Sequence, residues 1–99
     1  MSRFDVFPNP DGEGYLLDVQ ADLLSHLNTR LAIPTLPLAT APKPARTLNP
    51  LLEVRGVLCS VVTQYMASVP AGLLKSPVLN AGQRHDEIVA AIDLLLQGF

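Results

Sequence analysis

Short runs of alternating apolar and polar residues fill most of the first eighty positions, and they predict strands rather than helices. Residues 4–7 (FDVF) and 15–20 (YLLDVQ) are both rich in strand-forming side chains. In the second run Tyr15, Leu17 and Val19 fall on one face, while Asp18 and Gln20 share the other face. Segment 8–14 between the runs combines proline with glycine, which favours a turn. An antiparallel hairpin is therefore predicted.

A third alternating strand is predicted over Thr29–Ile33, and Pro34 is expected to end it because proline lacks a backbone N–H. Five of the nine prolines fall between positions 34 and 50. We expect a long ordered loop there, holding at most a short edge strand and no helix or central strand. A second hairpin is indicated around Arg55-Gly56, and a last short strand is predicted over Ala71–Leu74.

One helix is predicted, at about residues 82–97. Asn80 followed by Gln83 resembles a capping box, and Gly98 suits the left-handed residue that ends a helix. The positions spaced as one buried stripe are Ile88, Ala91, Ile92 and Leu95. Many short strands followed by one helix predict a single domain over residues 1–99, mainly β (α+β): a small antiparallel barrel with the C-terminal helix packed on it.

Composition narrows the classes of function. The 99 residues are 48% hydrophobic, enough for a core, and carry a net charge of -2. The seven basic residues are scattered, which disfavours direct nucleic-acid binding. Cys59 is the single cysteine and is expected to be a small buried hydrophobic residue. With no signal-peptide pattern and no membrane-spanning run, a soluble cytoplasmic protein is expected.

Catalytic chemistry is hard to find in this sequence. His26 and His85 lack metal-ligand spacing and are expected at the surface, and Asp18 and Asp22 are expected in solvent. We therefore predict no catalytic residue, no metal and no cofactor. One enzymatic alternative remains, a ribonuclease in which Arg30, His26 and Thr29 handle the 2′-oxygen of RNA, although the overall charge disfavours it.

The C-terminus has more apolar side chains than one helix face can bury. Leu94, Leu95 and Leu96 lie on three faces of the last helical turn, and Phe99 extends beyond the expected helix end. Two interpretations remain open. In the first, these side chains are buried, either at a homodimer contact or against their own barrel. In the second, they form an exposed apolar tip that binds a partner. Both hold together if a dimer axis brings two tips side by side.

Four blocks of the sequence resemble the CcdB family of toxins: 18–22 (DVQAD), 30–34 (RLAIP), 66–70 (MASVP) and 92–99 (IDLLLQGF). Their spacing is almost gap-free from Phe4 to Phe99. The resemblance implies a homodimer with an SH3-like barrel and a long C-terminal helix. It also implies a non-enzymatic toxin of a type II toxin–antitoxin system that binds the A subunit of DNA gyrase and traps the cleaved DNA–gyrase complex. A labile CcdA-like antitoxin would neutralise it, and operator DNA would be met only through the antitoxin complex.

The resemblance also implies which residues contact gyrase. In the family the contact is made mainly by a terminal Trp-Gly-Ile sequence, which corresponds here to Gln97, Gly98 and Phe99. The supporting contacts carried over by alignment are Ala21, Leu23, Leu24, Asp93 and Leu96. Gln97 replaces the tryptophan in a chain that contains none, while Phe99 adds ring area where the family has isoleucine. A CcdB-like binding module with weak or lost gyrase affinity is therefore the alternative.

Overall fold

The longest strand, β3 (Thr29–Pro37), organises the sheet because it pairs along both of its edges. One edge takes β2 (Tyr15–Asp18). The opposite edge takes β6 (Ala67–Pro70) along its first half and β5 (Val57–Val61) along its second half. The change of partner along one strand bends the sheet towards closure.

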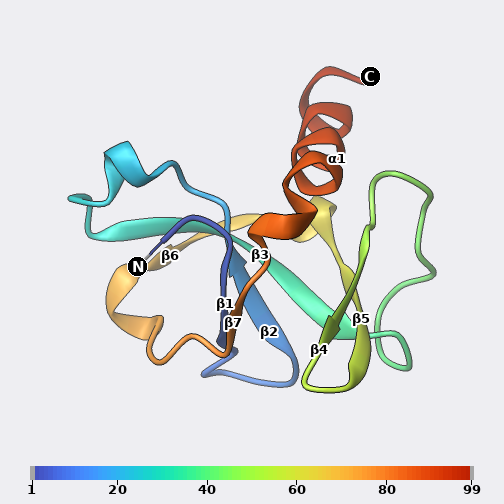
Figure 1. Cartoon of the computed structure of the whole chain (residues 1–99), viewed down its shortest axis with the longest axis horizontal. Helices are drawn as coiled ribbons and strands as arrows, with labels where there is room; N and C mark the ends of the chain where they lie inside the picture. The colour runs from blue at the N-terminus through green and yellow to red at the C-terminus, as the bar shows by residue number, and fades with distance from the viewer. Residues whose placement is uncertain (1, 99) are drawn as a thin grey trace.

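The outer strands complete a nearly closed antiparallel barrel in this computed structural model, which describes residues 2–98 (Figure 1). β1 (Asp5–Pro8) follows β2, β7 (Leu79–Asn80) follows β1, and β4 (Leu51–Val54) lies outside β5. The single α-helix, α1 (His85–Gln97), confirms the predicted mainly β (α+β) class. Four short 3-10 turns connect the elements: η1 (Asp22–Leu24), η2 (Thr63–Tyr65), η3 (Ala71–Leu73) and η4 (Gly82–Arg84).

The prediction that Pro34 ends the third strand is wrong, and so is the exclusion of a central strand from the proline-rich stretch. Pro34 and Pro37 both lie inside β3, which is a central strand. The carbonyl of Pro34 accepts the Val62 N–H at 2.9 Å, so its nitrogen faces the same edge. That edge is where the partner of β3 changes from β6 to β5, so the missing N–H interrupts no regular ladder.

Both predicted hairpins are confirmed. β1 and β2 pair with Val6 opposite Leu17. β4 and β5 pair on either side of a two-residue turn in which Arg55 has φ 51° and Gly56 has φ 80°. Positive φ at both central residues gives the twist that suits a two-residue hairpin.

The predicted strand over Ala71–Leu74 is wrong. The strand is β6, just before it, and residues 71–73 form the turn η3. The segment instead covers the sheet, since Leu74 is buried against Phe7 and Leu16. The two-residue strand β7 is too short to show any alternation and was not predicted.

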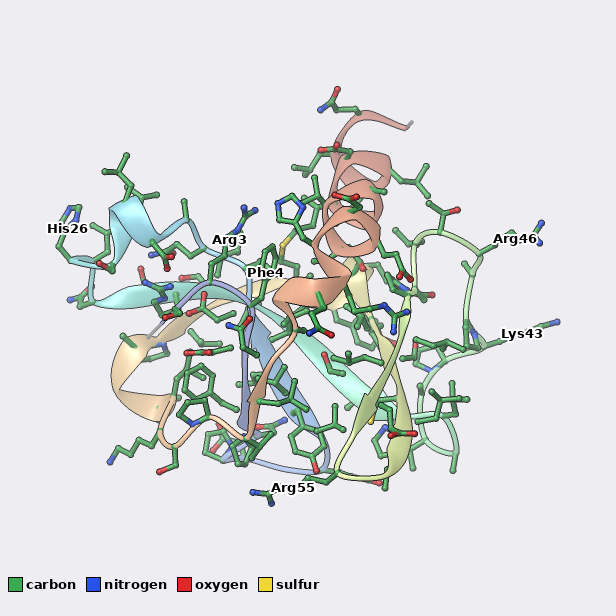
Figure 2. The ribbon with its side chains drawn as sticks, viewed as in Figure 1. Arg3, Phe4, His26, Lys43, Arg46 and Arg55 are labelled. Carbon is green, nitrogen blue, oxygen red and sulfur yellow. The ribbon has the colours of Figure 1, made fainter. Side chains whose placement is uncertain are left out.

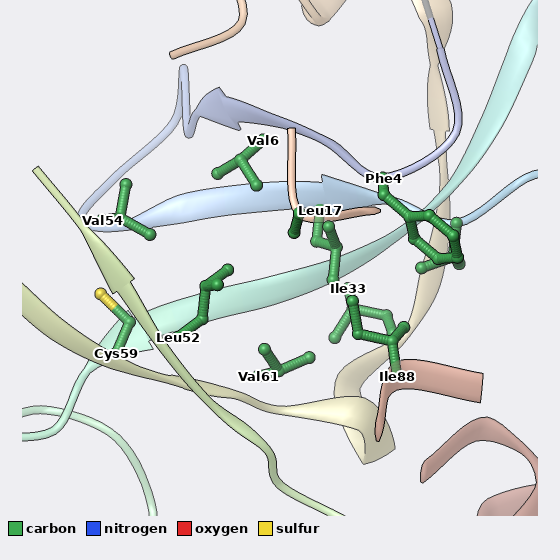
Figure 3. Packing of buried hydrophobic residues seen from close by; sticks show 11 residues of the cluster. Phe4, Val6, Leu17, Ile33, Leu52, Val54, Cys59, Val61 and Ile88 are labelled. Atoms are coloured by element: carbon green, nitrogen blue, oxygen red, sulfur yellow. The ribbon is translucent and has the colours of Figure 1, made fainter. Parts of the chain in front are cut away.

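Two cores lie on opposite faces of the strands β1, β2 and β3. Adjacent residues of each strand point to opposite sides, so Val6, Leu17 and Ile33 enter the barrel while their neighbours face the segment after β6. The barrel core is drawn in Figure 3 and comprises Phe4, Val6, Leu17, Val19, Ile33, Leu52, Val54, Cys59, Val61, Ala81 and Ile88. The second core comprises Phe7, Leu16, Ala32 and Leu74. Cys59 is fully buried in this core, which confirms it as a small buried hydrophobic side chain, and burial raises the pKa of its thiol.

Asp18 is fully buried, which contradicts its predicted place on a solvated face. It lies on the face of β2 that carries Leu16, and this face is covered by the segment after β6. Its partner is Arg30, also fully buried, whose Nη2 and Nε lie 2.7 and 2.9 Å from Asp18 Oδ2. Burial raises the pKa of the Asp18 carboxyl, and the hydrogen bond from Arg30 opposes that rise.

This ion pair generates the first prediction. In Asp18→Asn the side chain keeps its shape but Arg30 loses its counter-ion in the interior. We expect the free energy of unfolding to fall by about 3–5 kcal/mol, measured by urea denaturation. The exposed Glu53→Gln is the matched control and should shift stability by less than about 0.5 kcal/mol. Equal stability of the two variants would contradict a structural role for the pair.

Candidate functional site

The start of α1 is tied to the first strand by Asn80. Its Nδ2 donates to the Arg3 carbonyl at 2.9 Å and to Asp5 Oδ1 at 3.0 Å. Its Oδ1 accepts the Gly82 N–H at 2.8 Å. The predicted capping box with Gln83 is therefore wrong, because the Asn80 oxygen accepts the Gly82 N–H instead of the Gln83 N–H, and α1 begins only at His85. The result is a helix whose first turn is fixed to the barrel.

Only the first part of α1 packs on the barrel. Ile88 and Ala91 are buried, and Ile92 is partly buried against the barrel core. Leu95 is 38% exposed, so its predicted place in the buried stripe is wrong. Figure 1 shows the reason: α1 rises away from the strands, so its last turn extends beyond the barrel.

The last turn of α1 presents several of the predicted contact residues, here called the helix tip (Asp93 and 96–98). Leu96 is 69% exposed, Gln97 and Gly98 are exposed, and Asp93 is half-buried. Gly98 has φ 81° and donates its N–H to the Leu94 carbonyl at 2.9 Å, which confirms it as the residue that ends the helix. Phe99 lies outside the described residues.

The other predicted contact residues lie in the connection between β2 and β3, here called the η1 loop (21–28). Leu23 is 87% exposed, the highest value among the large hydrophobic residues described, and Leu24 is 42% exposed. Ala21 is exposed, and its carbonyl accepts the Leu24 N–H at 2.9 Å. The loop thus presents a leucine that residues 2–98 leave almost uncovered.

The predicted residues therefore form two groups on separate elements. In Figure 1 the η1 loop and α1 both rise above the strands, one at the left and one at the right. Each group combines exposed leucine with exposed backbone or polar groups. Covering one exposed leucine side chain contributes about 1.5–3 kcal/mol, so two such projections are suited to binding another macromolecule.

The structure does not assemble the residues of the ribonuclease alternative. Arg30 is fully buried and bonded to Asp18, so its guanidinium is withheld from any RNA. His26 is exposed at the end of the η1 loop. Figure 2 also shows Lys43 and Arg46 on one loop, with Arg3 and Arg55 on other sides of the molecule, so the labelled basic residues do not form one patch. The His85 ring is exposed as well and meets the Phe4 ring edge-on at 5.4 Å.

A surface pocket of about 380 Å³ lies apart from both groups, lined by Thr47, Pro50, Asp86, Glu87 and Ala90. Arg84 bonds to Glu87 at 2.6 and 2.8 Å and holds the pKa of Glu87 below its usual range. Within residues 2–98 no cluster of three potential metal ligands occurs, and no helix there has the length and apolarity to cross a membrane.

Sequence reasoning missed the polar residues that hold the η1 loop. Gln20, placed with Asp18 on one polar face, bonds to the middle of this loop at Leu24 and to the start of β3 at Thr29 and Leu31. Arg30, a charge inside the alternating run 29–33, was a signal for the Asp18 pair, because a buried charge needs a partner, but the Gln20 contacts with the backbone had no such signal.

Comparison with known protein families gives one match. The family described as CcdB protein matches residues 3–98, which is nearly the whole chain and includes both the η1 loop and the described helix tip.

The exposure of the two groups generates the second prediction. Leu23→Ala and Leu96→Ala should each leave the free energy of unfolding within about 0.5 kcal/mol of the parent, since neither side chain packs in the fold. Ile88→Ala, on the buried side of α1, is the matched control and should lose about 2–5 kcal/mol. A large loss in either exposed variant, measured by urea denaturation, would show that the leucine serves folding.

Proposed function

The chain belongs to the CcdB family of toxins from toxin–antitoxin systems, and from this premise we propose that it poisons DNA gyrase by binding its A subunit. The observation that carries the proposal is the exposure of Leu96 at the helix tip together with Leu23 on the η1 loop. These residues occupy the positions that correspond to gyrase contacts in the family. Binding through them requires no catalytic residue in the toxin.

The toxin would trap the cleaved DNA–gyrase complex if it bound this state of the gyrase cycle more tightly than the other states. A ligand shifts an equilibrium only by the difference between its affinities for the two states. A hundredfold preference for the cleaved complex corresponds to about 2.7 kcal/mol, which burial of one or two leucine side chains supplies. The cleaved DNA–gyrase complex then accumulates and replication stops.

We propose that the protein acts as a homodimer. Three consecutive leucines, Leu94 to Leu96, end a helix that projects beyond its own barrel, and Leu95 is more exposed than one buried stripe predicts. A two-fold axis near the helix tips would cover some of this surface and place two tips side by side. The gyrase contact would then be made by both subunits.

A CcdA-like antitoxin completes the proposal, since toxins of this family act within toxin–antitoxin systems. The antitoxin would neutralise the toxin by covering surface that gyrase needs. The open reading frame next to this gene is where it is expected.

Gln97 supports a second candidate function, a CcdB-like module that keeps its antitoxin but binds gyrase weakly. This residue is exposed at the helix tip, where the family carries tryptophan. An amide offers less apolar area than an indole, and loss of an aromatic hot spot weakens binding by about 2 kcal/mol or more.

The third prediction tests the helix tip. Purified protein incubated with gyrase and supercoiled plasmid should increase the amount of linear DNA released from the cleaved complex. Deletion of Gly98 and Phe99 should abolish this increase, while the circular dichroism spectrum stays that of the parent. Leu58→Ala is the matched control, an exposed leucine on β5, and should trap as the parent does. Full trapping by the deletion variant would refute the helix tip as the gyrase contact.

The fourth prediction separates the two candidate functions. Gln97→Trp should tighten binding to the gyrase A subunit by about thirtyfold, because about 2 kcal/mol of aromatic contact is restored. Isothermal titration calorimetry on parent and variant measures the change. If the parent fails to bind at micromolar concentration and the variant binds, the weak-affinity module is correct. An unchanged affinity would show that residue 97 does not touch gyrase.

A further inference from the structure

The η1 loop has no apolar anchor of its own. All nine residues from 21 to 29 are exposed, so burial of side chains contributes little to its conformation. Short backbone bonds hold its turns, such as the Ser25 N–H to the Asp22 carbonyl at 3.0 Å and the Leu27 N–H to the Leu24 carbonyl at 3.1 Å. A loop of this composition needs a further constraint to keep Leu23 in one place.

The side chain of Gln20 supplies that constraint. Its Nε2 donates to the carbonyls of Leu24 and Thr29, each at 3.1 Å, and its Oε1 accepts the Leu31 N–H at 3.1 Å. One amide therefore joins the middle of the loop to its far end and to the first residues of β3. Both amide hydrogens and the amide oxygen have partners.

The backbone of Gln20 is fixed in turn by the buried ion pair. Its N–H donates to Asp18 Oδ1 at 3.0 Å, and its carbonyl accepts from Arg30 Nη2 at 3.5 Å. The near end of the loop is held by Arg3, whose N–H donates to Asp22 Oδ1 at 2.8 Å and whose Nε donates to the Val19 carbonyl at 3.0 Å. The buried ion pair thus fixes Gln20, and Gln20 in turn fixes the loop that carries the exposed leucines.

We propose that Gln20 is a positioning residue: its amide holds the η1 loop in the conformation in which Leu23 and Leu24 meet the gyrase A subunit. The inference rests on the proposed function and adds the residue that fixes the position of this contact. A loop that is ordered before binding loses less conformational entropy when the complex forms. The leucines touch the partner, and the free energy gained by burying their side chains then goes fully into binding.

The test compares Gln20→Ala with Gln83→Ala, a variant of an exposed glutamine on η4. Hydrogen exchange of the free protein is the first readout. In Gln20→Ala the amides of Leu24, Ser25 and Leu27 should exchange about tenfold faster, because the bonds that close the loop are gone, while those of β4 and β5 stay unchanged. Gln20→Glu is the second variant. It keeps the acceptor for the Leu31 N–H but loses both donors, and it should show the same acceleration.

Affinity for the gyrase A subunit is the second readout, measured by calorimetry on the full chain. Gln20→Ala should bind about tenfold more weakly than the parent, and Gln83→Ala should bind equally well. In a background that already carries Leu23→Ala and Leu24→Ala, adding Gln20→Ala should change affinity by less than about twofold, since the glutamine acts through those leucines. A merely structural role would weaken both backgrounds alike.

The outcomes separate the two proposals. If the parent binds gyrase and Gln20→Ala binds equally well, or if exchange in the loop is unchanged, the positioning role is overturned. If the parent does not bind the gyrase A subunit, the proposed function fails and the partner named here fails with it, while the exchange data still decide whether Gln20 orders the loop.

Discussion

Asp18 and Arg30 lie twelve residues apart in the chain, and their side chains meet where neither has access to water. A charge left alone there would be strongly destabilising, so β2 and β3 must pair in the register that joins the two, with Asp18 opposite Ala32. Val19 still enters the barrel core, whereas residues 21–28 do not. They are held outside as the η1 loop, and this loop carries the most exposed leucine described.

The same division between a packed interior and a projecting element recurs at the other end of the chain. Asn80 fixes the start of α1, Ile88 and Ala91 bury its first turns, and the remaining turns extend past the barrel until Gly98 ends the helix. If the segments that carry these exposed leucines were mobile, the leucines would favour aggregation. On rigid supports they favour one defined contact, which suits the binding role proposed for this toxin.

The proposed contact residues and the residues that support them were predictable to different degrees. The exposure of Leu96 follows from counting helix faces, because one sheet buries only one stripe. The importance of Leu23 was implied by family resemblance alone, since a leucine between polar residues has no local signature of exposure. Asp18 was assigned to solvent, and Gln20 to the same polar face, because alternation identifies a polar face but does not say what covers it. That face is covered by a segment some fifty residues later, around Leu74.

The sequence by itself determined the features that depend on a few neighbouring residues: the turn at Arg55-Gly56, the hairpin at the N-terminus and the helix end at Gly98. These features are set by backbone angles that glycine and proline allow or forbid locally. Only the tertiary structure decided that β3 continues through Pro34, that Asp18 is buried and that residues 71–73 form a turn. Each of these depends on which distant strand edge or side chain lies opposite, and spacing along one chain does not carry that information.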